Sequence, residues 1–212
     1  MRLADVFPRV EIAAAMPGAI FRDLDVQGLE SFTADNPDTM IAFGFATWDH
    51  ALSSGRHDDL DPQMLAGPIN DEDPWLIRHV EAALGQQALL DFHYAAARTP
   101  GAPEPFASVS LAHLYPNHLH IGDVLLLDPN RPRQDSRWVD QKYASLRLFG
   151  VLLENLRAAA AALGVEKLTL TAANRPLRAT FERHGFRLAD TMGARMIEAV
   201  GAAHGFPMER AV

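Results

Sequence analysis

The second half of the chain alternates apolar and polar positions in patterns that predict strands and helices in succession. Residues 88–97 (ALLDFHYAAA), 106–115 (FASVSLAHLY) and 118–128 (HLHIGDVLLLD) are predicted strands. The second alternates apolar with polar residues, as a half-buried strand does. The third ends in an unbroken apolar run, which suits the centre of a sheet. Pro129 is expected to end this third strand, because proline cannot donate to a strand ladder.

A long helical pattern comes next. Leu152, Leu156 and Leu163 recur at helical spacing, and Gly164 is placed to end the helix. Four shorter elements are predicted after it: a strand at 167–171, a helix at 176–183, and a final pair of strands at 186–190 and 194–200. This order predicts an α/β fold of the α+β type, in which helices pack on a mixed sheet.

The N-terminal part of the chain carries less pattern. Residues 39–48 (TMIAFGFATW) are apolar and aromatic, and we predict a strand there. Residues 50–69 are polar and contain glycine and prolines, which favours a loop or a short helix. A helix is predicted at 75–84, with Asp73 as its N-cap and Gly85 as its stop.

The composition limits the class of protein. The chain has 212 residues, 48% of them hydrophobic and 22% charged, which allows one domain with a sizeable core. There are no cysteines, so disulfides, thiolate zinc sites and cysteine nucleophiles are excluded. The net charge of −8 argues against a nucleic-acid partner. No apolar run could cross a bilayer, and Asp5, Arg9 and Glu11 interrupt any signal-peptide core. We therefore expect a cytoplasmic protein without a membrane partner.

The most informative segment is 152–186, which reads LLENLRAAAAALGVEKLTLTAANRPLRATFERHGF. Its leucine pair, the Gly164 after a helix, the following strand, Asn174 and the Phe-Glu-x-x-Gly-Phe ending resemble the C-terminal half of the GCN5-related N-acetyltransferase (GNAT) signature. With the strand ending at 124–127, the resemblance covers roughly residues 106–200. It implies a central mixed, mostly antiparallel sheet flanked by helices. It also implies one acyltransferase-like domain over 1–212, in which 106–200 bind the cofactor and the divergent 1–105 shape the acceptor pocket.

The resemblance implies acetyl-CoA or another acyl-CoA as co-substrate. In the family, the pantetheine arm pairs with a splayed central strand, and the pyrophosphate sits on N–H groups at the start of the main helix. Ten residues of this chain are expected to bind the cofactor: Val124, Leu125, Leu126, Leu127, Arg131, Arg133, Arg147, Gly150, Asn174 and Phe181. Arginine matters here because the chain has only two lysines, Lys142 and Lys167. Asn174 is also suited to cap the following helix.

Two positions depart from the family pattern. The segment at the place of the family's phosphate loop, 144–150 (ASLRLFG), has Gly150 as its one glycine, a position late. Side chains there keep backbone N–H groups farther from a pyrophosphate. Phe181 stands where the family often has a tyrosine that protonates the leaving sulfur, and phenylalanine has no proton to give.

Three residues are candidates for catalysis: His120, Asp123 and Asp128. His118 and His120 share one face of their strand, since they are two positions apart, and a neutral histidine suits a general base. Asp123 and Asp128 on the same strand are the alternative bases. A metal site that combines these histidines with His113 and Asp123 is a weaker interpretation, and we predict no metal.

The sequence thus predicts an acyl-CoA-dependent N-acyltransferase that acts by direct transfer to a small-molecule or peptide amine. Two alternatives stay open. One is an acyltransferase of the same fold that takes its acyl group from an acyl carrier protein, and the other is a non-catalytic domain that binds coenzyme A or another ligand. If the protein forms an oligomer, we expect a homodimer.

Overall fold

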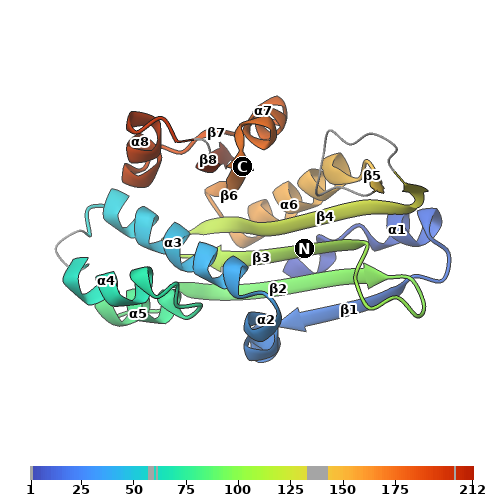
Figure 1. Ribbon diagram of the computed structural model, residues 1–212, viewed down its shortest axis with the longest axis horizontal. Helices are drawn as coiled ribbons and strands as arrows, with labels where there is room; N and C mark the ends of the chain where they lie inside the picture. Colours follow the sequence, from blue (N-terminus) through green and yellow to red (C-terminus); the bar gives the residue numbers. More distant parts are fainter. Residues whose placement is uncertain (1, 57–59, 61, 133–142, 203) are drawn as a thin grey trace.

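An eight-stranded sheet forms the centre of the computed structural model, which describes residues 2–56, 60, 62–132, 143–202 and 204–212 (Figure 1). The strands are β1 (Ile20–Asp25), β2 (Leu89–Arg98), β3 (Ala107–Leu114), β4 (His118–Pro132), β5 (Tyr143–Ser145), β6 (Lys167–Asn174), β7 (Arg187–Leu188) and β8 (His204–Ala211). Their order is β1-β2-β3-β4-β6-β8-β7, and β5 pairs with β4 off this path. The β4–β6 pair is parallel and the other pairs are antiparallel.

Helices cover both faces of this sheet. The α-helices are α1 (Arg9–Ala15), α2 (Leu29–Asp35), α3 (Pro37–Ser53), α4 (Pro62–Asn70), α5 (Leu76–Leu84), α6 (Phe149–Leu163), α7 (Arg175–Arg183) and α8 (Met192–Ala199), with 3₁₀ turns η1 (Leu3–Asp5) and η2 (Val26–Gly28). Leu152 and Leu156 of α6 share one buried cluster with Leu119 and Ile121 of β4. Phe43 of α3 lies in a separate cluster on the other face, with α2, α5, β2 and β3. The predicted fold class, a mixed and mostly antiparallel sheet flanked by helices, is confirmed.

The prediction of a strand at 39–48 is wrong, because these residues belong to helix α3. Pro37 occupies the first turn, where its missing N–H costs nothing. Met40, Phe43 and Thr47 are buried at spacings of three and four, so they form one apolar stripe against the sheet. The aromatic and small residues of this segment suit a strand by composition, but packing of the apolar stripe against the sheet stabilises a helix. The open choice for 50–69 resolves into the end of α3 and the short helix α4.

The last predicted strand, 194–200, is also wrong, because α8 occupies this segment. The Thr191 hydroxyl accepts a hydrogen bond from Ala194 N at 3.3 Å and so caps the helix. The strand after it, β8, was not predicted. Nor does β4 end at Pro129: it runs on to Pro132, beside the short strand β5.

The remaining predicted elements agree with the structure within a few residues. The strands at 88–97, 106–115 and 167–171 correspond to β2, β3 and β6, and the helices at 75–84 and 176–183 correspond to α5 and α7. The N-terminal β1 pairs with β2 in the same sheet, so residues on both sides of position 105 contribute strands to it. The division of roles at this position stays a prediction. No helix in the described ranges combines the length and apolar character that crossing a bilayer requires.

Candidate functional site

The two central strands β4 and β6 run side by side only over their first residues. Their parallel pairing begins at His118↔Lys167 and ends at Ile121↔Leu170. Beyond this point β6 continues beside β8, while β4 continues beside β3 (Figure 1). Within the described residues, no strand pairs with the β6-facing edge of β4 at 122–125, and β5 takes over at Leu127. Such an edge presents backbone N–H and C=O groups that can accept an extended ligand as an added strand.

A β-bulge at Gly122 marks the start of this divergence. Ser110 pairs with Asp123 and Leu111 with Ile121, so Gly122 is an extra residue on β4. A bulge bends its strand and sharpens the local twist. A Cβ atom on Gly122 would lie 2.6 Å from the ring of Phe43, so only glycine allows α3 to come this close. The bulge therefore sets both the direction of β4 and the position of α3.

The predicted phosphate-binding segment, 144–150, forms the end of β5 and the beginning of α6. Arg147 is exposed and has a φ of 60°, in the left-handed region that favours glycine. Leu148 is the N-cap of α6 and provides no side-chain cap, so the N–H groups of the first turn have no partner within the helix. Gly150 lies in this turn, with no other atom within 4 Å of the place where a Cβ would stand. Arg131 is exposed near the end of β4, whereas Arg133 lies outside the described residues.

Two predicted cofactor residues lie at the end of β6 and on α7: Asn174 is the last residue of β6, and Phe181 belongs to α7. Asn174 Oδ1 accepts a hydrogen bond from Leu177 N at 3.0 Å, which confirms its role as an N-cap. The ring of Phe181 packs at 5.6 Å from that of Phe149, the first residue of α6. Of the four predicted residues on β4, Val124 and Leu125 lie on the open edge, while the carbonyl of Leu126 already accepts from Leu146 N at 2.9 Å.

The predicted histidine pair lies on the face of β4 that α3 covers. His118 and His120 are 6% and 2% exposed, so both rings are buried. His120 Nδ1 lies 3.0 Å from Thr169 Oγ1, and the ring of His118 packs at 4.2 Å from that of His50 on α3. Burial, helped by the neighbouring charges, lowers the pKa of His118 and His120 to about 3 and that of His50 to about 4. All three rings are therefore neutral near pH 7.

The two predicted aspartates differ in their surroundings. Asp123 is exposed and pairs directly with Ser110, whose hydroxyl accepts from Asp123 N at 2.8 Å. Asp128 lies farther along β4, where its carboxylate accepts from Asn130 N at 3.0 Å. His120 and Asp123 thus flank the bulge, and Asp128 does not. No group of three or more metal-ligating side chains is found among the residues that the structure describes.

An apolar cavity of about 620 Å³ opens beside the point where β4 and β6 part. Its walls come from α3, β6, α8 and β8, and His120 and Thr169 are among its lining residues. The sequence did not predict this cavity, because α3 and α8 were both expected to be strands. Asp49 of α3 joins the two helices: its carboxylate accepts from the Thr191 hydroxyl at 2.5 Å and from Gly193 N at 2.7 Å.

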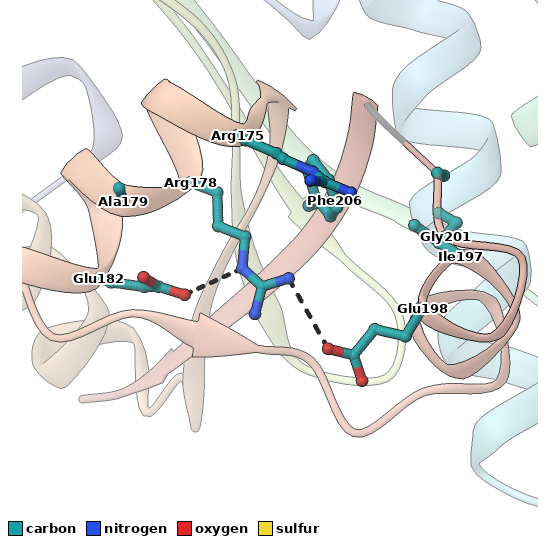
Figure 2. A pocket seen from close by; sticks show the side chains of 9 residues that line it. Arg175, Arg178, Ala179, Glu182, Ile197, Glu198, Gly201 and Phe206 are labelled. Carbon is teal, nitrogen blue, oxygen red and sulfur yellow. Dashed lines mark hydrogen bonds and ion pairs between the residues drawn. The ribbon is translucent and has the colours of Figure 1, made fainter.

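A second hollow, of about 680 Å³, lies between α7, α8 and β8 (Figure 2). Figure 2 shows Arg178 between two carboxylates, Glu182 and Glu198, at 2.9 and 3.7 Å. Its guanidinium also stands over the ring of Phe206, 5.3 Å from the centroid. The charge of Arg178 is therefore balanced within the protein, and we assign this hollow no role in binding.

The comparisons with known proteins concern the fold. No protein-family model and no curated protein matches the sequence. An acetyltransferase of the GNAT family from Staphylococcus aureus Mu50 is 14% identical, with 91% of this chain and 99% of that chain covered and a TM-score of 0.39. A GNAT family acetyltransferase from Elizabethkingia anophelis, solved with acetyl-CoA bound, is 13% identical, with 57% of this chain and 76% of that chain covered and a TM-score of 0.36. An IAA acetyltransferase from Bacillus cereus is 16% identical, with 57% of this chain and 78% of that chain covered and a TM-score of 0.33.

Because these TM-scores lie below 0.5, we take the fold from the strands themselves. The resemblance of segment 152–186 implied a mixed, mostly antiparallel sheet with a splayed central strand, and the structure has such a sheet, in which β4 diverges from β6. The chain has a GNAT-like fold.

Proposed function

We propose that this protein is a GNAT-superfamily N-acyltransferase that transfers an acyl group, with acetyl-CoA as the first donor to test, directly to an amine. The observation that carries the proposal is the divergence of β4 from β6 at Gly122, which leaves a backbone edge open beside the start of α6. The apolar cavity next to this point supports an acceptor site there.

The donor would extend along β4 and end at α6. In this proposal the pantetheine amides pair with the open edge at 122–125, and the pyrophosphate lies on the uncapped N–H groups at 149–151. The positive end of the helix dipole favours the phosphates, and the exposed Arg147 and Arg131 add charge. The left-handed backbone of Arg147 supports this use, because such conformations persist where a loop has to take a particular shape.

The reaction needs few groups from the protein. The amine nitrogen attacks the thioester carbonyl, and backbone N–H groups of the open β4 edge stabilise the oxyanion. The carbon–sulfur bond then breaks, the nitrogen loses a proton, and the thiolate takes one from water, since Phe181 has none to give. Asp123 is the best-placed proton acceptor of the three candidates, because it is exposed beside the bulge. His120, with a pKa of about 3 owing to burial, is a weak base and serves as a neutral partner in a hydrogen bond.

Binding and turnover provide the test. Acetyl-CoA at about 100 times its dissociation constant should raise the free energy of unfolding by roughly 2.7 kcal/mol, measured as a shift in Tm. Turnover releases coenzyme A, whose thiol reacts with a chromogenic disulfide. The chain has no cysteines, so it contributes no background to this assay. The proposal fails if no acyl-CoA stabilises the protein.

Two observations favour alternative functions, a non-catalytic binding domain and an acyltransferase that uses an acyl carrier protein. Phe181 lacks the hydroxyl of the family's tyrosine, which favours a non-catalytic binding domain. Side chains at 144–149 in place of glycines favour an acyl carrier protein as donor. Stabilisation by free coenzyme A without turnover of any amine would support the first, and turnover with an acylated carrier protein but not with acyl-CoA would support the second. In all three cases we propose that residues 1–105 shape the acceptor pocket, through the wall that α3 contributes.

A further inference from the structure

We infer that the acceptor is an amine on an apolar body, such as a phenylalkyl or medium-length alkyl amine, and that it carries no carboxylate. The inference rests on the proposed function, because it assigns the cavity between α3 and α8 to the acceptor. A cavity of about 620 Å³ is within the range of small-molecule sites and exceeds what a compact polar amine would fill.

One side of helix α3 forms the wall of the cavity. Ile41, Ala42 and Phe45 line it at spacings of one, three and four, so they lie on a single helical face. The opposite face of α3, with Met40 and Phe43, is buried against the sheet. The apolar wall of the cavity is therefore fixed by the packing of α3 against the sheet.

Two methionines of α8, Met192 and Met196, line the cavity as well. They are 43% and 61% exposed, which is high for large apolar side chains. Methionine is unbranched and adapts its shape to what it contacts. An apolar body in the cavity would cover part of this exposed surface, and the hydrophobic effect would favour its binding.

The charged residues that line the cavity determine which polar group the acceptor can carry. No arginine or lysine is among the described residues that line the cavity, and its charged groups are Asp38 and Asp49. Asp49 is occupied by Thr191 and Gly193. Asp38 is exposed in the first turn of α3, next to Thr39, whose methyl group touches the bulge at Gly122. The Asp38 carboxylate, at the end of α3 that meets the bulge, attracts an ammonium group, whereas the carboxylate of an amino acid would find no cation among these lining residues.

The cavity also fixes the orientation of the acceptor. Its lining includes His120 on β4 and Thr169 and Thr171 on β6, so one end of it lies at the point where these strands part. The thioester would lie at the same point. An amine bound with its apolar body between α3 and α8 therefore presents its nitrogen to the thioester carbon, as the reaction requires.

Pairs of amines that differ in one group test the inference, with acetyl-CoA as donor and thiol release as readout. Phenethylamine should be acetylated with a higher kcat/KM than phenylalanine, and hexylamine with a higher kcat/KM than 6-aminohexanoate. We expect about 10-fold or more in each pair, since the second member brings a carboxylate to a cavity whose described lining holds Asp38 and Asp49 and no cation. Equal or higher values for the second members would overturn the inference.

A cavity-filling variant with a matched control provides a second test. Ala42→Phe should raise the KM for phenethylamine by about 10-fold or more and leave the KM for acetyl-CoA unchanged. Ala82→Phe introduces the same side chain at an exposed position of α5 and should change neither constant. An unchanged amine KM in Ala42→Phe would overturn the inference. If acetyl-CoA fails to stabilise the wild-type protein, the proposed function fails instead, and if only polar amines are acylated, the function stands while this inference falls.

Discussion

Buried histidines should make the protein sensitive to mild acid, above all His50, His118 and His120, and burial lowers the pKa of the fourth, His93, as well. An unfolded chain protonates its histidines below a pKa of about 6.5. In the folded protein, burial lowers the pKa of His118 and His120 to about 3 and that of His50 to about 4. Above pH 6.5 the rings are neutral in both states, so they do not lower the free energy of unfolding. As the pH falls from 6.5 towards 4, only the unfolded state takes up protons, so the free energy of unfolding decreases.

The size of the effect follows from the width of that window. At pH 5 each ring costs about 2 kcal/mol of folding free energy relative to pH 7, so the three together cost about 6 kcal/mol. A domain is typically stable by only about 5–15 kcal/mol, so much of its stability would be gone. Urea denaturation at pH 7 and pH 5, followed by the fluorescence of the three tryptophans, measures the difference directly.

The variant His118→Phe isolates one ring. His118 Nδ1 is buried without a hydrogen-bond partner among the described residues, so an apolar aromatic ring should be tolerated there. The loss of stability between pH 7 and pH 5 should shrink from about 6 to about 4 kcal/mol. Ala82→Phe, at an exposed position of α5, serves as control, because it adds an aromatic ring and removes no ionisable group, so it should leave the loss as it is. An equal loss in His118→Phe and the wild type would refute the reasoning.

Three further substitutions test the site. Gly122→Ala places a methyl group 2.6 Å from Phe43 and should lower the free energy of unfolding by about 1–3 kcal/mol and weaken acetyl-CoA binding; wild-type stability would contradict the bulge's role. Arg147→Gly relieves the left-handed backbone and should raise the unfolding free energy by about 1 kcal/mol while raising the Kd for coenzyme A, and a lower unfolding free energy would argue against strain there. Asn174→Ser should keep the cap of α7, and hence the Tm, but weaken coenzyme A binding; unchanged binding by calorimetry would leave Asn174 with the structural role alone.

The sequence predicted α6, β6 and α7 well because local signals define them. Gly164 and Gly185, both with positive φ, end their helices, and Asn174 begins α7 with a side-chain cap. It failed for α3 and α8, whose helical period is hidden by aromatic, small and exposed apolar residues. Local composition cannot show which face of such a segment the rest of the protein will bury.

Some features of the candidate site could likewise be predicted from the sequence, and others could not. That His118 and His120 share a face follows from strand geometry alone. Their burial does not, because it depends on α3, which the sequence did not reveal as a helix. The apolar cavity could not be predicted at all, since it forms between α3 and α8, two helices far apart in the chain that were expected to be strands, and the strands β6 and β8.

The contact between Asp49 and Gly193 has a consequence for evolution. The two residues are 144 positions apart, yet a Cβ at position 193 would lie 2.9 Å from the Asp49 carboxylate that accepts from its backbone N–H. A lineage that replaced the glycine would have to move this carboxylate or lose it, so the two positions should co-vary among descendants of a common ancestor. Where both change, α8 would lose its hydrogen bonds to Asp49 and keep the one from Met192 N to Ser53 Oγ, so its attachment to α3 would weaken. The cavity between these helices would then be free to diverge towards acceptors of another shape.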